Sequence, residues 1–103
     1  MIIYNVTIQV DWSIHEEWLL WMKEIHIPDV LGTGMFTHHR MVKLLEIDET
    51  DGPTYAVQYF TPSLANYYHY VNYFADDLRQ KGTDKWGERF VAFRTVMQAV
   101  DEQ

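Results

Sequence analysis

The segment that decides the fold prediction runs from Trp18 to Phe36 and reads WLLWMKEIHIPDVLGTGMF. Its first half repeats apolar residues at spacings of three and four, which is the pattern of an amphipathic helix with one buried face. The apolar stripe begins just upstream and consists of Ile14, Trp18, Trp21, Met22 and Ile25. Pro28 disfavours helical geometry in the residue before it, so we expect the helix to end near His26. Residues 28–31 can form one short turn that Gly32 stops, and Gly34 gives further freedom before the next strand.

A strand is predicted before this helix. The residues from Ile2 to Val10 alternate between an apolar side and a mixed side, as in a strand buried on one face. The apolar side consists of Ile2, Tyr4, Val6, Ile8 and Val10. Downstream, Ser13 and Glu16 have the spacing of a capping box, in which each side chain satisfies a free backbone amide. We therefore expect the helix to begin at Ser13.

After the helix, two further strands are predicted to form a hairpin. Residues 36–48 are rich in strand formers, but their alternation is imperfect, which indicates a bulge or a strand covered on both faces. Residues 48–53 form a polar turn with both glycine and proline, and residues 55–60 read as the next strand.

A second helix and a last strand complete the chain. Residues 61–63, Thr-Pro-Ser, are predicted to cap the helix with proline at its first position, and Gly82 is expected to end it. Its apolar stripe consists of Leu64, Tyr67, Val71, Phe74, Ala75 and Leu78. Residues 83–87 are expected to form a turn that carries Trp86. Residues 89–100 are predicted to be a strand whose more apolar side holds Val91, Phe93, Thr95, Met97 and Ala99.

The order of elements is therefore strand, helix, strand, strand, helix, strand. This βαββαβ order is the ferredoxin-like pattern of the α+β class, a four-stranded antiparallel sheet with two helices on one face. Right-handed crossovers place the first and last strands at or next to the centre of the sheet. We expect one such domain over residues 1–103, with no linker or repeat.

Composition excludes several classes of function. The chain has no cysteine, so disulfides and thiolate chemistry are excluded and a cytoplasmic location is expected. Its 15 acidic and 8 basic residues give a formal charge of -7, which disfavours nucleic acid as a partner. The sequence has neither a basic leader nor a long apolar run, so neither export nor a membrane span is expected. No glycine-rich phosphate loop, serine elbow or paired-carboxylate motif is present.

The sheet face left bare by the helices is predicted to be neither solvated surface nor core. It is expected to hold Ile3, Asn5, Thr7 and Gln9, then Ala56, Gln58 and Phe60, then Phe90, Ala92, Arg94, Val96 and Gln98. A solvated face would be more charged, whereas a core would exclude an arginine and several glutamines. A second subunit that covers this face and leaves a polar-lined cavity accounts for both.

Three segments carry a resemblance to a known family. They are residues 26–36, which contain HIPDVL and GMF, residues 52–59, GPTYAVQY, and residues 90–95, FVAFRT. The chain resembles, over nearly its whole length, a bacterial family described as domain of unknown function 4286. The resemblance implies the dimeric α/β barrel superfamily, in which two ferredoxin-like subunits pack sheet to sheet as a homodimer. It implies no mechanism, because the family has no assigned activity.

Two charged or titratable residues are candidates for ligand binding. Arg94 could clamp a carboxylate or phosphate in the dimer cavity, or it could form an ion pair between subunits or across strands, with Glu46 or Glu88 as possible partners. His26 could move a proton or bind an acidic ligand at the cavity mouth. Alternatively, His26 is a histidine at a helix C-terminus that interacts with the helix dipole.

Uncharged polar residues could complete the same site. Asn5, Thr7 and Gln58 would add hydrogen bonds in the cavity, or they would bond one another. The aromatic run that follows on the second helix favours core and interface over a cofactor site, with Tyr67 and Phe74 in the stripe. We expect Tyr68, Tyr70 and Tyr73 to point away from the core.

No metal site and no cofactor are predicted. The histidines at positions 15, 26, 38, 39 and 69 do not have ligand spacing. Some dimeric α/β barrels are cofactor-independent or haem-degrading monooxygenases that use an asparagine on the first strand with a tryptophan and a histidine. Asn5 and His69 match two of these elements, but no tryptophan matches the third.

The sequence thus predicts a cytoplasmic homodimer that binds a small, anionic or aromatic ligand between its sheets or at the barrel mouth. The residues assigned to this site are Arg94, Asn5, Gln58, His26 and Thr7. A monooxygenase is the first alternative, and a structural or interaction module is the second. No residue pattern predicts a particular reaction.

Overall fold

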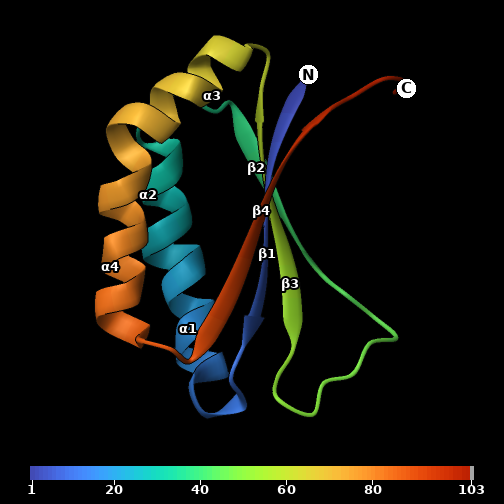
Figure 1. Cartoon of the computed structure of the whole chain (residues 1–103), viewed down its shortest axis with the longest axis vertical. Helices are drawn as coiled ribbons and strands as arrows, with labels where there is room; N and C mark the ends of the chain where they lie inside the picture. Colours follow the sequence, from blue (N-terminus) through green and yellow to red (C-terminus); the bar gives the residue numbers. More distant parts are fainter. Residues whose placement is uncertain (103) are drawn as a thin grey trace.

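The computed structural model describes residues 1–102, and within them four antiparallel strands form one sheet in the order β2-β3-β1-β4. The strands are β1 (Ile2–Val10), β2 (His38–Lys43), β3 (Thr54–Thr61) and β4 (Phe90–Gln98). Two helical segments pack side by side on one face, and the other face is open (Figure 1). This is the predicted ferredoxin-like α+β fold, with the first strand central and the last strand at the edge beside it.

The first helical segment continues past the proline that was expected to end it. It comprises a 3-10 turn (Trp12–Ile14), α1 (His15–Trp21), a π-helical turn (Met22–His26) and α2 (Ile27–Leu31). The Ile27 N–H donates to the Met22 carbonyl, five residues back. This widened turn directly precedes Pro28 and accommodates a residue that has no N–H. The predicted end near His26 is therefore wrong, and the segment ends at Gly32.

The π-helical turn also explains which apolar residues are buried. Because a π-helical turn contains an extra residue, it rotates the residues that follow it around the helix axis. Ile25, which was assigned to the core stripe, is half exposed, whereas Ile27 is buried. Ile14, Trp18 and Met22 are buried as predicted.

The start of the same segment uses a different cap from the predicted one. The Asp11 carboxylate accepts a hydrogen bond from the backbone N–H of Ser13 at 2.8 Å. Helical winding therefore begins at Trp12, one residue before the expected start. The predicted capping box of Ser13 and Glu16 is wrong because Asp11 already provides the acceptor.

The second helical segment is longer than predicted. It comprises α3 (Leu64–Tyr70), a π-helical turn (Val71–Ala75) and α4 (Asp76–Trp86). Ser63 is the N-cap and accepts from the Asn66 N–H, so the proline of the predicted cap precedes the helix. Gly82 lies inside α4 and does not end it. Gly87, with φ of 62°, follows the last helical residue and ends the segment.

The edge strand β2 is shorter than the predicted residues 36–48. Pairing with β3 extends only from His38 to Lys43, and most of this strand is exposed. The imperfect alternation arises because the apolar residues after Lys43 lie in the loop to β3 and not in the strand. Neither a bulge nor burial on both faces is needed to explain it.

The pairing register shows that the two sides of β4 were predicted to lie on the wrong faces of the sheet. In β1 and β3 the residues predicted to face away from the helices do so, since Asn5 pairs with Gln58. In β4 the prediction is reversed, because Arg94 pairs with Val6, which faces the helices. The helix-facing residues of β4 are thus Phe90, Ala92, Arg94, Val96 and Gln98. The apolar side of β4, with Phe93, lies on the open face.

The core lies between the sheet and the helices. The sheet contributes a row of aromatic and aliphatic residues, and each helical segment contributes buried residues that pack on it. Tyr70 belongs to this core, where its ring is tilted against that of Tyr4 and lies edge-on to that of Phe36, so its expected outward direction is wrong. Tyr68 and Tyr73 are exposed as predicted. Because a sheet and two helices bury a shared apolar layer, the remaining polar groups in this layer stand out.

Candidate functional site

A small cavity lies in the layer between the helices and the β1–β4 side of the sheet. Its volume is about 50 Å³, which is room for a few water molecules or a group of that size. Its walls are mostly aromatic and aliphatic. The lining residues that carry polar groups are Tyr4, Trp18, Trp21, His26, Tyr59, Tyr70, Arg79, Trp86 and Arg94.

Two arginines line this cavity, and within residues 1–102 neither forms an ion pair. Arg79 extends from α4, and Arg94 extends from the helix-facing side of β4. Arg79 Nη2 donates to the Tyr4 hydroxyl at 3.1 Å. No aspartate or glutamate is among the residues that line the cavity. In a chain with a net charge of -7, this is a local excess of positive charge.

An outer groove adjoins the cavity and has the same two arginines on its wall. Phe90, Ala92, Arg79 and Arg94 line both spaces, so the arginines lie where the cavity meets the groove. The groove is larger, at about 470 Å³, and Glu88 is the only carboxylate among its lining residues. Among residues 1–102, neither Glu46 nor Glu88 forms an ion pair with Arg94. The alternative of a cross-strand ion pair is therefore wrong, and an ion pair between subunits stays a prediction.

His26 lines the cavity from the π-helical turn. Its ring stacks on Trp21, with ring centroids 4.9 Å apart and an interplanar angle of 22°. The pKa of His26 is lowered from 6.5 to about 4, chiefly by burial; Asp29 partly opposes this shift, and the charges of Arg94 and Lys81 add to it. His26 is therefore neutral at pH 7. It lies within the helical segment, so the alternative of a helix C-terminal histidine is wrong.

Several polar atoms of the cavity residues have no partner. The indole N–H of Trp86 and the Nε–H of Arg79 are buried and make no hydrogen bond within the described residues. Burial also raises the pKa of Tyr59 and Tyr70, so their hydroxyls remain protonated. A buried donor without an acceptor costs about 1–3 kcal/mol, which a water molecule or a ligand can offset. The buried atoms of these residues that lack a partner are thus donors.

Three predicted site residues lie on the other side of the sheet. Asn5, Thr7 and Gln58 all face the open side, away from Arg94 and His26. Asn5 Nδ2 donates to Thr7 Oγ1 at 3.0 Å, and Asn5 Oδ1 is buried without a partner in the described part of the chain. The predicted single cluster is therefore two groups, one on each face of the sheet.

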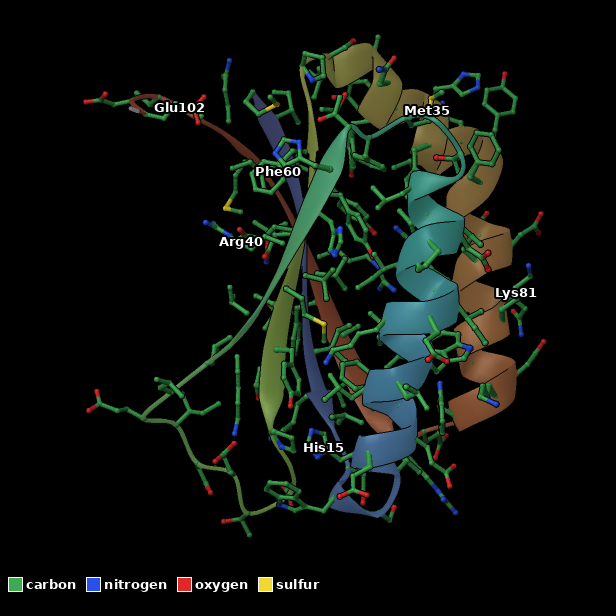
Figure 2. The ribbon with its side chains drawn as sticks, turned by 180° about the vertical axis from the view of Figure 1, so that it is seen from behind. His15, Met35, Arg40, Phe60, Lys81 and Glu102 are labelled. Atoms are coloured by element: carbon green, nitrogen blue, oxygen red, sulfur yellow. The ribbon has the colours of Figure 1, made fainter. Side chains whose placement is uncertain are left out.

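The open face also carries an aromatic and basic group. The rings of His38 and Phe60 stack in parallel at 4.5 Å, and Arg40 lies over the same phenylalanine. Arg40 donates to Gln58 Oε1 from two nitrogens, at 3.1 and 2.6 Å. Figure 2 shows Arg40 and Phe60 on the side of the sheet opposite the helices, with Lys81 on the outer surface of the helical layer.

The family of the chain follows from a match over most of its length. The model of a family described as a domain of unknown function, DUF4286, matches residues 1–100. The chain belongs to the DUF4286 family. No curated protein matches the sequence of this DUF4286 domain. The resemblance noted from three short segments is thus confirmed.

Solved structures share the fold of the DUF4286 domain at low sequence identity. One is a dimeric ferredoxin-like protein from an uncultured marine organism, with a TM-score of 0.70, 11% identity and coverage of 99% of this chain and 97% of the other. Another is SnoaB, a cofactor-independent oxygenase from Streptomyces nogalater, with a TM-score of 0.65, 8% identity and coverage of 98% and 94%. At these identities the similarity shows the fold alone.

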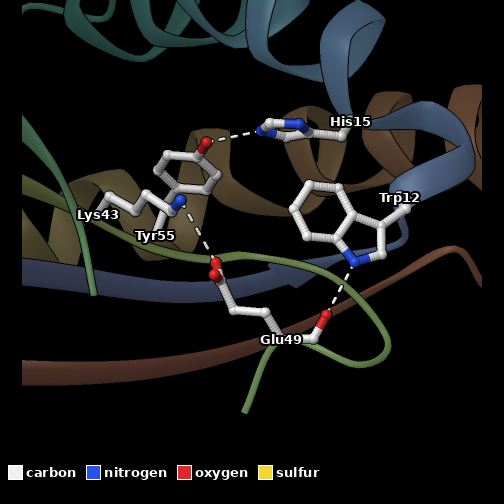
Figure 3. A network of polar contacts seen from close by, with 5 residues as sticks. All are labelled: Trp12, His15, Lys43, Glu49 and Tyr55. Atoms are coloured by element: carbon white, nitrogen blue, oxygen red, sulfur yellow. Dashed lines mark hydrogen bonds and ion pairs between the residues drawn. The ribbon is translucent and has the colours of Figure 1, made fainter. Parts of the chain in front are cut away.

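A separate polar network fixes the start of the first helical segment in the DUF4286 domain (Figure 3). His15 Nε2 and the Tyr55 hydroxyl lie 2.6 Å apart, and Trp12 Nε1 donates to the Glu49 carbonyl at 2.8 Å. Lys43 and Glu49 form an ion pair at 3.4 Å. None of these residues lines the cavity, so we assign this network to structure.

The site predicted from the sequence did not include two residues of the cavity, Trp86 and Arg79. Trp86 was placed in a turn, and Arg79 was not considered. A stripe of Ala75, Leu78, Gly82 and Trp86 at spacings of three and four would have predicted both the longer helix and a buried Trp86. Nothing in the local pattern marks Arg79, because its significance arises from the strand that faces it.

The described residues contain neither a candidate membrane span nor a candidate metal cluster. Within residues 1–102 no helix is both long and apolar enough to span a bilayer. In the same part of the chain, no three side chains of histidine, aspartate or glutamate come together as a candidate metal site.

Proposed function

We propose that this DUF4286 domain is a cytoplasmic homodimer that binds a small molecule in the cavity between its helices and sheet. The observation that supports binding is the set of buried, unpartnered donors on residues that line an otherwise aromatic cavity. Ligand sites commonly combine apolar walls with a few polar groups in this way. The proposed site differs from the sheet-to-sheet cavity expected from sequence.

Filling the cavity tests this proposal. Ala92 faces the helices and lines the cavity, so Ala92→Leu would occupy part of its space. Ala65→Leu, at an exposed position of α3, is the matched control. Benzoate, benzamide and benzamidine have one ring and differ in charge, and calorimetric titration measures their binding. We expect at least one of them to bind the wild type and the control, and Ala92→Leu to weaken its binding by tenfold or more, about 1.4 kcal/mol.

Two outcomes would contradict binding in this cavity. One is that none of the three compounds binds the wild-type protein at millimolar concentration. The other is that Ala92→Leu, shown to be folded by circular dichroism, binds as the wild type does.

The open sheet face supports the homodimer. No strand residue on this face is aspartate or glutamate, despite the net charge of -7. Phe93 on this face is 66% exposed. The β2–β3 loop and the C-terminal residues project toward the same side in both views (Figures 1 and 2) and carry Leu45 and Val100, which are 76% and 96% exposed. A face with exposed apolar side chains and no carboxylate on its strands allows a second copy to pack without acidic repulsion.

The structural neighbour described as a dimeric ferredoxin-like protein adds support for this assembly. Sedimentation equilibrium measures the mass directly. We expect about twice the chain mass of 12.3 kDa at micromolar concentration. A monomer at all concentrations up to about 100 μM would contradict a stable homodimer.

An oxygenase is the second candidate, supported by the structural similarity to SnoaB and by three tryptophans on the cavity wall. It has less support than binding alone, because Asn5 faces the opposite side of the sheet from those tryptophans. Incubation with a hydroquinone or with haem under oxygen tests it. A protein-dependent spectral change that Ala92→Leu abolishes would favour the oxygenase, and an unchanged spectrum would remove it.

A further inference from the structure

The charges around the cavity constrain the chemistry of its ligand. Arg79 and Arg94 contribute two positive charges at the boundary of the cavity and the outer groove. Glu88, on the groove wall, contributes one negative charge. His26 is neutral at pH 7, so the charged groups on the walls of the two spaces are two guanidinium groups and one carboxylate. Asp76 also acts on Arg79 from outside the walls, so the arginines favour an anionic ligand but do not fix its charge.

The hydrogen-bonding groups of the cavity also favour an anionic ligand. Trp86 and Arg79 offer buried N–H groups that have no acceptor in the described structure. An anionic oxygen accepts several such bonds at once, and bonds to a charged group are about twice as strong as neutral ones. A neutral ligand rich in donors would leave both N–H groups unsatisfied, and a cation would be repelled by the arginines.

The sizes of the two spaces indicate how such a ligand would be arranged. The cavity of about 50 Å³ accommodates a group of about three heavy atoms, as in a carboxylate. The outer groove is much larger, and Phe90 and Ala92 provide apolar surface there. The arginines at the boundary can therefore hold a carboxylate while the apolar body of the ligand lies in the groove. A phosphate group has five heavy atoms, which is more than the cavity accommodates.

We propose that the ligand of this cavity is a small organic monocarboxylate, held by Arg79 and Arg94 with the indole N–H of Trp86 as a further donor. This inference rests on the proposed binding function and adds the class of ligand and the residues that select it. It also assigns Arg94 a partner that no carboxylate of the described chain provides.

The matched compounds test the ligand class on the wild-type protein. Isothermal titration at pH 7 compares benzoate, benzamide, benzamidine and inorganic phosphate. We expect benzoate to bind about tenfold or more tightly than benzamide, because only benzoate provides an anionic acceptor for the guanidinium groups. Benzamidine and phosphate are expected to bind more weakly than benzoate.

Three variants test the assigned residues. Arg94→Gln is expected to weaken benzoate binding about tenfold and to leave benzamide binding unchanged, because it removes one positive charge. Arg89→Gln removes the same charge from a residue that lines neither space, and benzoate binding should stay within about twofold. Trp86→Phe retains an aromatic ring without the N–H and should weaken benzoate binding about fivefold. Circular dichroism establishes that each variant is folded.

The outcomes separate this inference from the binding function. If benzamide binds as tightly as benzoate, or benzamidine binds most tightly, the cavity binds small molecules but the carboxylate assignment is wrong. If phosphate binds more tightly than benzoate, the site takes an oxyanion other than a monocarboxylate. If Arg94→Gln and Arg89→Gln have equal effects, Arg94 does not select the ligand. If no compound binds, both proposals fail.

Discussion

The two faces of the sheet leave opposite kinds of polar atom without a partner. On the helix-covered face the unpartnered atoms are donors, the indole N–H of Trp86 and the Nε–H of Arg79. On the open face the unpartnered atom is an acceptor, Oδ1 of Asn5. The donors lie near a small cavity with two arginines at its opening, whereas the acceptor lies on a broad face with an exposed phenylalanine.

This difference indicates two different occupants. A small enclosed space with excess donors and positive charge suits an anionic group. A broad face with exposed apolar side chains suits a second protein surface, which can bring donors of its own. On our proposal, ligand binding and subunit association lie on opposite faces of one sheet, so substitutions on one face should leave the other function intact.

The largest expected effect comes from a charge on the open face. Phe93→Asp would place two carboxylates in the proposed interface of two copies that are already acidic, and we expect the dimer to weaken by about 100-fold or more. Sedimentation velocity measures the dissociation constant. Benzoate binding to the monomer should persist.

A charge elsewhere is the control for this substitution. Tyr73→Asp places a carboxylate on another exposed aromatic position, which lies in the helical layer. It should leave the dimer intact. Equal dissociation by Tyr73→Asp, or an undisturbed dimer in Phe93→Asp, would show that the open face is not the interface.

A smaller effect concerns the helix-covered face and pH. The pKa of His26 is about 4 in the folded protein, below its usual 6.5, so the unfolded chain binds more protons between these values. The contribution of His26 to stability is complete above pH 6.5 and is lost as the pH falls toward 4. We expect about 1–3 kcal/mol of acid destabilisation from this group, measured by urea unfolding at a series of pH values.

His26→Phe isolates this contribution. The phenylalanine can retain the stack on Trp21 but cannot take up a proton. The variant should lose less stability than the wild type between pH 6.5 and 4, while Asp29, Arg94 and Lys81, which act on the pKa of His26, are unchanged. Parallel stability curves for the two proteins would contradict a buried, neutral histidine.

The smallest expected effect lies on the helix-covered face outside the cavity. Tyr55→Phe removes the hydroxyl that pairs with His15 and should lower the free energy of unfolding by about 1 kcal/mol. Benzoate affinity should not change, because Tyr55 does not line the cavity. The control Tyr73→Phe removes an exposed hydroxyl and should alter neither quantity. A change in benzoate affinity in Tyr55→Phe would mean that the whole helix-covered face contributes to binding.

The fold could be predicted from sequence because its signals are local. Strand alternation, helical stripes and turn residues gave the βαββαβ order, and β1 was placed at its observed bounds. The predicted helix ends were wrong at two places. A π-helical turn lets the first helical segment continue past Pro28, and the second segment continues through Gly82, although local rules predict an end at each residue. Such features depend on the packing that surrounds them.

The candidate site was only partly predictable. His26 and Arg94 were selected by residue type, and the structure brings both to one cavity. Asn5, Thr7 and Gln58 were grouped with them because the apolar side of β4 was taken to face the helices. That side, with Phe93, instead faces away. Alternation identifies the two sides of a strand, but it does not say whether a helix or another molecule covers the apolar one.

The indole N–H resonance of Trp86 tests the central claim most directly. Two-dimensional ¹H–¹⁵N spectra of the protein resolve the indole signals, which substitution of each tryptophan by phenylalanine assigns. Trp12 is an internal reference, because its Nε1 already donates to the Glu49 carbonyl at 2.8 Å. If an anion completes the cavity, benzoate shifts the Trp86 signal downfield and leaves Trp12 in place, while benzamide causes a smaller shift. An unmoved Trp86 signal at saturating benzoate, or an equal shift of Trp12, would contradict the account.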